Sequence, residues 1–310
     1  MPPREHAPYL RPVLRPQAGP EALGVRDRPD AVATPEPALA FPVPTPQPQA
    51  SRPAPTLTLR GVDVFFGGVH ALEHVDFDVY PREVVALVGE NAAGKSVLAK
   101  VLAGVYQPTA GQIAIDGAPV TIPNPTAAQR LGIATVFQDL ALANNLDVAA
   151  NLFLGRELRT GGVMRRAEME ILAREKLAEI GARIPSVRLP VSTLSGGQRQ
   201  SVAIARAMLG QPRIVVLDEP TASLSITQTA EVLDVIQRMR ELGCGVVLIS
   251  HNLADVQAVA DRVVVLRHGR NNGDAPVSQV TYEDIVAAIT GAACTLPTPA
   301  PQLVRRVVGS

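Results

Sequence analysis

The segment Gly89-Glu-Asn-Ala-Ala-Gly94-Lys95-Ser96 decides the fold of this 310-residue chain. The apolar run 84–88 comes directly before it, and a helix is expected from Ser96 onward. A glycine-rich loop between a buried strand and a helix presents backbone N–H groups and the positive end of the helix to phosphate oxygens. In such a loop we expect Lys95 to reach the β and γ phosphates of a nucleotide and the Ser96 hydroxyl to bind Mg²⁺. The alternative is an ordinary glycine turn before a helix.

Strands and helices alternate on either side of this loop. We expect strands at 56–65, 75–80, 84–88, 112–115, 214–217, 246–249 and 263–266. Helices are expected at 96–105, 197–209, 227–242 and 253–260, and a helix-rich stretch is expected from about 148 to 181, strongest at 167–180. Such alternation favours a largely parallel sheet, so the expected fold class is α/β.

Two carboxylates follow the apolar strand 214–217. Asp218 and Glu219 stand at its C-terminal end, where a parallel sheet places its ligands. We expect Asp218 to hold Mg²⁺ or its waters and Glu219 to act as general base toward an attacking water. The pair is a weak signal alone, because strands often end in aspartate, and it becomes specific beside a phosphate loop.

Two shorter motifs accompany these groups. Leu194-Ser195-Gly196-Gly197-Gln198 opens a helix and offers a hydroxyl and flexible backbone amides to a second anion, although a helix N-cap explains it equally well. His251 follows the strand 246–249, so its imidazole is expected at the same end of the sheet as Asp218. A lone histidine in this position is more often structural than catalytic.

Composition limits the class of protein. The formal net charge is zero, which gives no general attraction to nucleic acid or lipid. No apolar run approaches the roughly 18 to 20 residues of a membrane helix, and the first residues lack the apolar stretch of a secretory signal. We expect a soluble protein that reaches a membrane only through a partner. Cys244 and Cys294 are expected to be free thiols, with a disulfide as the alternative.

The ends of the chain differ from its centre. Fifteen of the 28 prolines fall within residues 1–55, which are expected to form a disordered or extended tail; a ligand for a proline-binding domain is the alternative. Residues 292–310 are expected to form a flexible C-terminal tail. One folded domain is therefore expected at 56–291.

These motifs, in this order, resemble the ATP-binding cassette (ABC) ATPases. The resemblance covers residues 56–291 and includes the phosphate loop 89–96, Gln138 in Val-Phe-Gln-Asp, the signature 194–198, Asp218-Glu219 and His251. Other phosphate-loop families lack this signature upstream of the two-carboxylate strand. The resemblance implies a P-loop NTPase core with a parallel sheet flanked by helices, an N-terminal antiparallel β subdomain and an inserted α-helical subdomain at about 139–189.

The resemblance also implies ATP and Mg²⁺ as ligands, with named contacts. Phe66 would stack on adenine, with Phe65 as the other candidate stacker and a core position as the alternative for Phe66. Gln138 would sense Mg²⁺ and the attacking water, and His251 would hold the γ-phosphate. Mg²⁺ would be bound by Ser96, Gln138 and Asp218. The phosphates would be bound by Gly89, Asn91, Ala92, Ala93, Gly94, Lys95, Ser96 and Val97.

Two cassettes of this family pack head to tail, and each ATP lies between one phosphate loop and the other signature. Ser195, Gly196, Gly197 and Gln198 would therefore bind the ATP of a partner cassette, with Ser195 and Gly197 on its γ-phosphate. ATP would close the dimer and hydrolysis would reopen it. The helical subdomain would contact the membrane partner.

Three residues depart from the family pattern. Ala92 replaces a usual glycine, which costs about 1 kcal/mol if its backbone needs a positive φ. Val97 replaces a common threonine, and Ser225 replaces the usual aspartate of the loop that links the two sites. His70 and His74 suggest a metal site, but they are expected to straddle a turn and the start of a strand, and no third ligand is evident.

Four short sequence segments resemble those of cassettes for uptake of ribose, xylose and fructose. They are 68–72, 89–91, 145–155 and 250–256. Many of those proteins carry two cassettes, and this chain carries one, so a homodimer or a second cassette protein is required. The resemblance implies a multi-span permease, indirectly a sugar-binding protein, no nucleic acid, and a cytoplasmic position on the inner face of the cell membrane.

Two other functions are less consistent with the sequence. A soluble ABC-type ATPase switch acting on DNA or ribosomes would need a long coiled-coil insertion, or two cassettes with basic linkers, and neither is present. A non-hydrolysing regulatory module is disfavoured by Glu219 and His251.

Overall fold

The structure, a computed structural model, describes residues 53–292 and residue 296. The tails expected at 1–55 and 292–310 therefore lie almost wholly outside the described residues, and so does Cys294. Cys244 is buried and free. None of the described helices is both long and apolar enough to cross a membrane.

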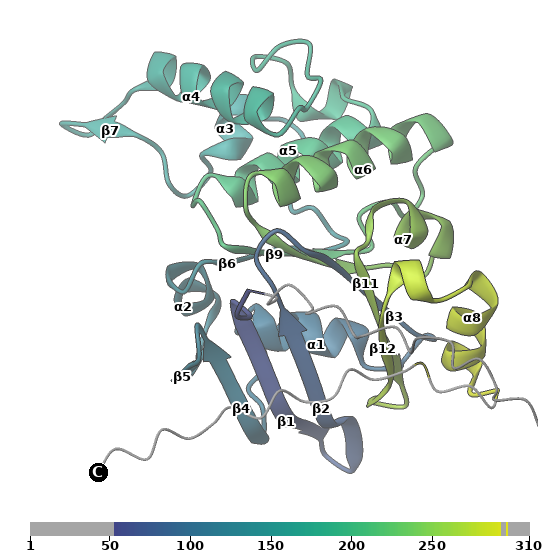
Figure 1. The fold of residues 1–310 in the computed structure, drawn as a ribbon. Helices are drawn as coiled ribbons and strands as arrows, with labels where there is room; N and C mark the ends of the chain where they lie inside the picture. Colours follow the sequence, from purple (N-terminus) through teal and green to yellow (C-terminus); the bar gives the residue numbers. More distant parts are fainter. Residues whose placement is uncertain (1–52, 293–295, 297–310) are drawn as a thin grey trace, which may run out of the picture. The chain divides into compact units, whose positions relative to one another are not determined.

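A six-stranded sheet forms the centre of the described chain (Figure 1). Its strand order is β12-β11-β3-β10-β9-β6, and all neighbours are parallel except β12, which is antiparallel to β11. Every residue of β3, β9 and β10 is buried, which explains why these strands read as continuous apolar runs. The strands are β3 (Val84–Val88), β6 (Ile133–Val136), β9 (Ile214–Asp218), β10 (Gly245–Ile249), β11 (Arg262–Arg267) and β12 (Arg270–Pro276).

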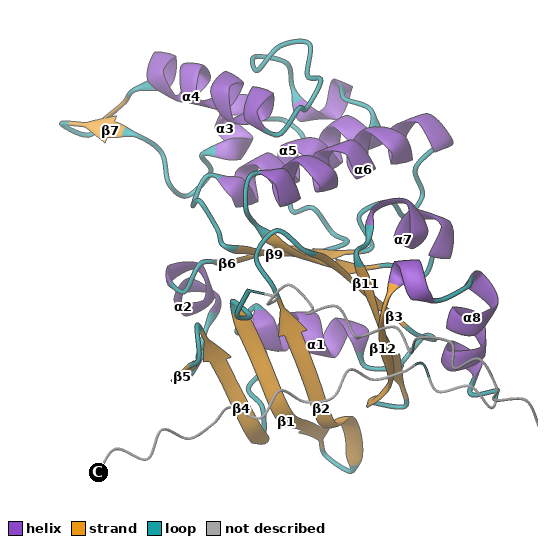
Figure 2. Ribbon diagram, in the orientation of Figure 1, coloured by secondary structure: helices purple, strands orange, loops and turns teal. Residues whose placement is uncertain are grey.

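A second, antiparallel sheet has the order β2-β1-β4-β5 (Figure 2). It comprises β1 (Leu57–Phe66), β2 (Val69–Val79), β4 (Ala110–Ile115) and β5 (Ala118–Val120). Helix α1 (Lys95–Leu102) lies between the two sheets, and its buried Leu98 shares one hydrophobic core with Leu59 of β1 and Val247 of β10. This packing fixes the start of α1 against the C-terminal ends of the parallel strands.

The other face of the central sheet is covered by helices. Helices α5 and α6 pack on each other, and α3 and α4 pack on α5. The hydrophobic core on this side includes residues of β9 and β10 together with all four helices. The remaining elements are α2 (Pro125–Arg130), α3 (Val148–Leu152), β7 (Arg159–Thr160), β8 (Val163–Met164), α4 (Arg166–Glu179), η1 (Val191–Thr193), α5 (Gly196–Met208), α6 (Ile226–Glu241), α7 (Leu253–Val259), η2 (Val277–Gln279) and α8 (Tyr282–Thr290).

The expected α/β class, with a parallel core sheet and an antiparallel β subdomain, is confirmed. The helix-rich stretch expected from about 148 to 181 is wrong in part, because a β7–β8 hairpin with Gly161 and Gly162 at its turn separates α3 from α4. Elements β5, α2, β6, β12 and α8 are additional; most are too short or too polar to show a clear period, such as the edge strand β12.

The expected placement of His70 and His74 at a turn is also wrong. Both residues lie within β2, which begins at Val69 because the turn at Gly67 and Gly68 is tight. The Nε2 atom of His70 is 2.9 Å from the Oδ1 atom of Asp63 on β1. The histidine therefore stabilises the β1–β2 hairpin.

A buried ion-pair network joins both sheets at the end of the core sheet away from the phosphate loop. Arg262 is 2% exposed, and its guanidinium contacts Glu83 (Nε to Oε1, 2.9 Å) and Asp274 (Nη1 to Oδ2, 2.8 Å). It also donates to the carbonyl oxygen of Asp78 at the end of β2, at 2.6 Å. Burial alone would lower the pKa of Arg262, but the two carboxylates outweigh burial and raise it.

Replacing Arg262 with methionine is expected to lower the free energy of unfolding by about 3 to 5 kcal/mol, because the buried ion pairs of Arg262 with Glu83 and Asp274 would be lost. Arg240→Met is the matched control. Its ion pair with Asp261 is partly exposed, and its loss should cost at most about 1 kcal/mol. Denaturant unfolding of both variants checks this, and equal losses would contradict the assignment.

Candidate functional site

The phosphate loop runs from the end of β3 to the start of α1 and is closely packed. Gly89 has φ +153° and Gly94 has φ +104°. A Cβ atom on Gly89 would lie 2.2 Å from the carbonyl oxygen of Leu266, and one on Gly94 would lie 2.7 Å from Cδ2 of Leu72. Glycine is therefore required at both positions, because the loop packs closely against Leu266 of β11 and Leu72 of β2.

Lys95 is the first residue of α1, and its side chain turns back over this loop. Its Nζ atom donates to the carbonyl oxygens of Gly89 at 2.8 Å and of Glu90 at 2.9 Å. Burial lowers the pKa of Lys95, while Glu219 and Asp218 oppose this lowering. A buried cation whose side-chain hydrogen bonds go only to backbone carbonyls suits an anionic ligand, as the sequence predicts for phosphate.

The neighbouring loop residues have different exposures. Ser96 and Asn91 are exposed, Ala93 is buried, and Val97 is half-buried against the core that surrounds α1. The Ser96 hydroxyl is thus accessible at the first turn of α1. The threonine-to-valine departure at position 97 places an apolar side chain against an apolar core, which explains why the chain tolerates it.

Ala92 adopts the left-handed backbone conformation, with φ +64°, for which the alanine is expected to be unfavourable. An L-residue with a Cβ atom is strained in this region, and glycine is not. The alanine therefore costs stability at a position where the family usually has glycine.

Ala92→Gly is expected to raise the free energy of unfolding by about 0.5 to 1 kcal/mol. The matched control is Ala178→Gly on the exposed side of α4, which should lower it by about 1 kcal/mol because glycine is a poor helix residue. Denaturant unfolding measures both changes. Destabilisation by both substitutions would show that the backbone at Ala92 is not strained.

Asp218, Glu219 and His251 meet at the edge of the sheet where the phosphate loop lies. Strands β9 and β10 are in register with Ile249 opposite Asp218, so the residues after them emerge together. The Oε2 atom of Glu219 lies 2.7 Å from Nδ1 of His251, and the backbone N–H of Glu219 donates to the carbonyl oxygen of Ile249 at 3.0 Å. The structure brings together the two carboxylates and the histidine that the sequence singles out.

The environment of Asp218 differs from that of Glu219. Asp218 is buried, and burial followed by the charge of Glu219 raises its pKa, while Lys100 and Lys95 lower it. A carboxylate destabilised in this way gains from a cation, which fits Mg²⁺. Glu219 has φ +53° and a side chain 17% exposed, so it faces the open side of the site.

Asp255 on α7 links the two loops that carry Glu219 and His251. Its carboxylate accepts hydrogen bonds from Oγ1 of Thr221 at 2.6 Å and from Nδ2 of Asn252 at 3.0 Å. Asp255 is not among the residues that the sequence predicts for the site. The only available signal was a charged residue on the otherwise apolar face of a short helix, four positions after His251.

The signature segment begins helix α5 with a capping box. The Ser195 Oγ accepts from the backbone N–H of Gln198 at 3.2 Å, and Oε1 of Gln198 accepts from the backbone N–H of Ser195 at 3.0 Å. The N-cap alternative is therefore correct as local structure. A Cβ atom on Gly196 would lie 2.7 Å from Leu224 Cδ2, so this glycine permits close packing against the loop before α6.

The signature segment and the phosphate loop lie at the starts of different helices, α5 and α1. Among the described residues, no hydrogen bond or ion pair joins residues 195–198 to the phosphate loop. Ser225, the departure in the loop between them, is the N-cap of α6, with its Oγ accepting from the backbone N–H of Gln228 at 3.4 Å. The serine at this position therefore caps the N-terminus of α6.

The two adjacent phenylalanines lie at the β1–β2 hairpin. Phe66 is 42% exposed and contacts Tyr106 edge-to-face, with ring centroids 4.9 Å apart. The core alternative for Phe66 is therefore wrong. Phe65 stacks on His70 at 3.9 Å, so one face of its ring is already covered. Of the two rings, Phe66 is the better candidate for stacking on a base.

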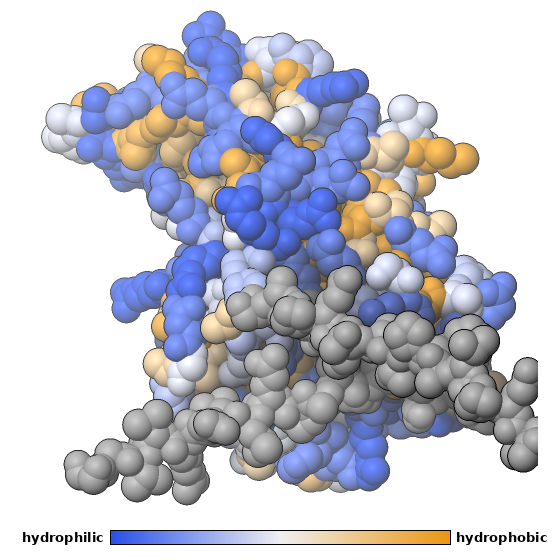
Figure 3. Space-filling model, viewed as in Figure 1, coloured by the Kyte–Doolittle hydropathy of each residue, from blue (hydrophilic) through white to orange (hydrophobic). Residues whose placement is uncertain are grey.

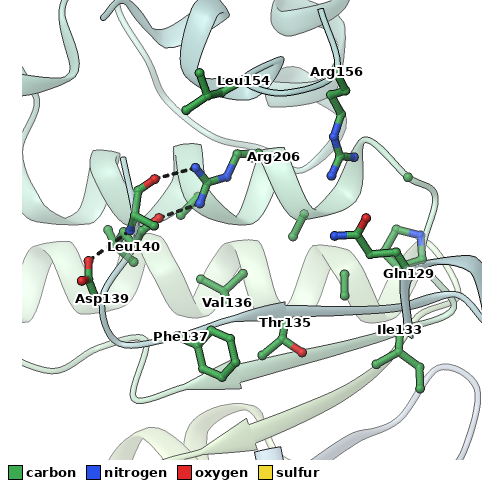
Figure 4. Close-up of a pocket in the computed structure, with 16 residues that line it drawn as sticks. Gln129, Ile133, Thr135, Val136, Phe137, Asp139, Leu140, Leu154, Arg156 and Arg206 are labelled. Carbon is green, nitrogen blue, oxygen red and sulfur yellow. Dashed lines mark hydrogen bonds between the residues drawn. The ribbon is translucent and has the colours of Figure 1, made fainter. Parts of the chain in front are cut away.

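Gln138 lies in the bend directly after β6 and is exposed. The residues that follow it border a pocket of about 320 Å³ between β6, α5 and the loop after α3 (Figure 4). The structure thus places Gln138 beyond the C-terminal end of the strand next to β9, at the same edge of the sheet as Asp218.

Comparisons with known proteins agree with this geometry. The family model described as ABC transporter matches residues 72–222. The chain is 44% identical over 246 residues to the fructose import ATP-binding protein FrcA of Rhizobium meliloti, covering 77% of this chain and 95% of that protein. It is 43% identical over 237 residues to the ribose import ATP-binding protein RbsA 2 of Escherichia coli O157:H7, covering 76% of this chain and 47% of that protein. The chain therefore spans about half the length of that ribose relative.

Solved structures show the same fold. The cassette cbiO1 from Clostridium perfringens, part of an ABC transporter complex, matches with a TM-score of 0.65 and 27% identity, covering 75% of this chain and 92% of that chain. The ATP-binding cassette MJ1267 in its ADP conformation matches with a TM-score of 0.66 and 22% identity, covering 77% and 96%.

Proposed function

The chain belongs to the family of ABC transporter ATP-binding proteins, and on that premise we propose that it hydrolyses ATP as a dimer to power uptake of a monosaccharide through a separate membrane permease. The observation that carries the proposal is the convergence of Lys95, Asp218, Glu219 and His251 at one edge of the sheet. Phosphoryl transfer needs positioning and charge neutralisation, and these groups supply both.

The phosphate loop binds the ATP phosphates through its backbone N–H groups and Lys95. Phe66 stacks on adenine. Mg²⁺, when bound, neutralises charge on the phosphates and is held by Ser96, Asp218 and Gln138. The fit to a cation rests on the buried carboxylate of Asp218, whose pKa is raised by burial and by the charge of Glu219.

Glu219 orients the attacking water and accepts its proton. His251 holds the γ-phosphate, a role supported by its contact with the Glu219 carboxylate. Removal of a general base typically costs about 100-fold to 10,000-fold in rate. These two residues therefore carry the largest share of the chemistry that side chains contribute.

The dimer is supported by the position of the signature segment. Among the described residues, Ser195, Gly196, Gly197 and Gln198 form no hydrogen bond or ion pair with the phosphate loop, so we assign them to the ATP of a second cassette, either another copy of this chain or a related protein. Ser195 offers its hydroxyl, and the start of α5 offers the positive end of the helix.

The partner in the membrane is a permease, and the helical segment at about 139–189 contacts it. Figure 3 shows apolar side chains gathered over the β7–β8 hairpin and α4. Large exposed apolar residues in these elements are Val163, Met164, Ile171 and Leu172. Exposed apolar patches of this kind mark interaction sites. The protein then lies on the cytoplasmic face of the membrane, and a sugar-binding protein supplies the permease.

The test is ATP turnover of the full chain with its permease in lipid nanodiscs, with and without sugar-loaded binding protein. If the protein powers sugar import, ATP turnover should rise when the binding protein carries fructose, ribose or xylose. Nucleic acid should not raise it. Stimulation by DNA or ribosomes in place of the permease would favour the alternative, a soluble ATPase switch.

A further inference from the structure

Arg206 on helix α5 holds the loop that follows Gln138. Its guanidinium donates from Nη2 to the carbonyl oxygen of Leu140 at 2.6 Å and from Nη1 to the carbonyl oxygen of Ala141 at 2.8 Å (Figure 4). The two acceptors belong to consecutive residues, so the planar fork fixes both the position and the orientation of this backbone.

The loop needs such support. Ala141 has φ +47°, a strained conformation for alanine, and its N–H donates to Oδ1 of Asp139 at 3.1 Å. Gln138 and Asp139 are exposed, and β6, which precedes them, ends at Val136. Without Arg206, the segment would keep the turn formed by Asp139 and the packing of Leu140 against the core, but the carbonyl oxygens of Leu140 and Ala141 would lose their side-chain donor.

The arrangement is costly, which argues that it serves more than packing. Burial lowers the pKa of Arg206, and the nearby guanidinium of Arg156 lowers it further. Among the described residues, no carboxylate pairs with Arg206. A half-buried cation without a counter-ion is unfavourable, so its hydrogen bonds must compensate for the lost hydration. In Arg206 these hydrogen bonds order the loop 138–141.

Helix α5 carries the signature at one end and Arg206 near the other. It begins after Ser195 and continues to Met208 with a largely buried face. Arg206 is 11 positions after Ser195, about 16 Å along a rigid helix. The start of the helix and the Gln138 loop are thus attached to one body.

We propose that Arg206 is a positioning residue for ATP hydrolysis, which places Gln138 relative to the signature helix so that both move as one unit. This rests on the proposed function of Gln138 in binding Mg²⁺ and the attacking water. Arg206 touches neither ATP nor metal and acts only through the loop 138–141.

The experiment is a double-mutant cycle on steady-state turnover of the full chain, with Arg206→Met, Gln138→Ala and the double variant. Arg206→Met should lower kcat about 10-fold to 100-fold with little change in the KM for ATP, and it should raise the Mg²⁺ concentration needed for half-maximal rate. In the Gln138→Ala background, the same substitution should change kcat less than about twofold.

Three further measurements make the result specific. Arg206→Lys, which retains the charge but lacks the fork, should be intermediate. Arg174→Met on α4, whose guanidinium faces Glu170, should leave kcat unchanged. Hydrogen exchange of the amides at 139–141, measured without nucleotide, should speed up in Arg206→Met and not in Arg174→Met.

The outcomes separate the two claims. If Gln138→Ala retains full turnover, the proposed function of Gln138 is wrong and the positioning role of Arg206 falls with it. If Gln138→Ala is impaired and the Arg206→Met loss is fully additive to it, only the proposal for Arg206 is overturned. Unchanged exchange at 139–141 would also overturn it.

Discussion

The variant Glu219→Gln should hydrolyse ATP at least about 100-fold more slowly than the wild-type chain while still dimerising when ATP is added. Glutamine has the shape of glutamate and can still contact the imidazole of His251, whose Nδ1 lies 2.7 Å from the native carboxylate. It cannot accept the proton of the attacking water. The loss therefore falls on the chemical step, and ATP binding and dimer closure remain.

Turnover is measured by phosphate release, and dimerisation by size-exclusion chromatography with and without ATP. Glu283→Gln, an exposed residue of α8, is the matched control and should leave both properties unchanged. Turnover of Glu219→Gln within a few-fold of wild type would remove Glu219 from the role of base.

The variant Lys95→Ala should lose both ATP affinity and turnover, the latter by about 100-fold to 1,000-fold. The ammonium lies over the phosphate loop, held by the carbonyl oxygens of Gly89 and Glu90. Its removal takes away the one side-chain cation within the loop that can neutralise the β and γ phosphates. The burial that lowers its pKa also means that the charge acts in a poorly solvated place, where it interacts strongly.

Binding of a fluorescent ATP analogue and phosphate release measure the two losses. Lys176→Ala is the control, since that lysine forms an ion pair with Glu179 on α4 far from the loop in sequence. Because Lys95 is buried, its replacement could also affect folding, so the thermal unfolding of Lys95→Ala is measured alongside the two assays. A folded Lys95→Ala variant with normal ATP affinity would contradict the phosphate role.

The sequence predicts the parts of the site that are local. A strand, a glycine-rich loop and a helix lie within a short segment, so the phosphate loop and the roles expected at Gly89 and Gly94 follow from chain order alone. Strands β9 and β10 are continuous apolar runs, so the residues after them, Glu219 and His251, could be placed at one edge of the sheet.

The contacts that support the site depend on packing between distant segments. Arg206 and Leu140 are 66 residues apart, and Arg262 and Glu83 are 179 residues apart. Nothing in the period or spacing of the sequence pairs them. The extended start of β2 at His70 was missed because the Gly67-Gly68 turn consumes only two residues, and the β7–β8 hairpin was missed because its strands have two residues each.

Ala92 could be predicted from the sequence only in part. The sequence shows alanine where the family usually has glycine, but only the backbone reveals the strain, with φ +64°. The departure leaves the positions of Lys95 and Glu219 intact, so we expect it to affect stability more than the chemical step.

The central claim is that each ATP site is built from two chains, and a mixing experiment tests it most directly. Lys95→Ala damages the phosphate half-site, and Ser195→Arg damages the signature half-site. In a random one-to-one mixture, half of the dimers are mixed, and each mixed dimer has one fully intact site, so turnover should recover to about a quarter of the wild-type rate.

Lys95→Ala mixed with Glu219→Gln is the matched control, because both lesions lie in the same half-site and no intact site can form. The account predicts recovery in the first mixture and none in the second. Turnover in the first mixture that equals the mean of its two inactive components would contradict a site shared between chains.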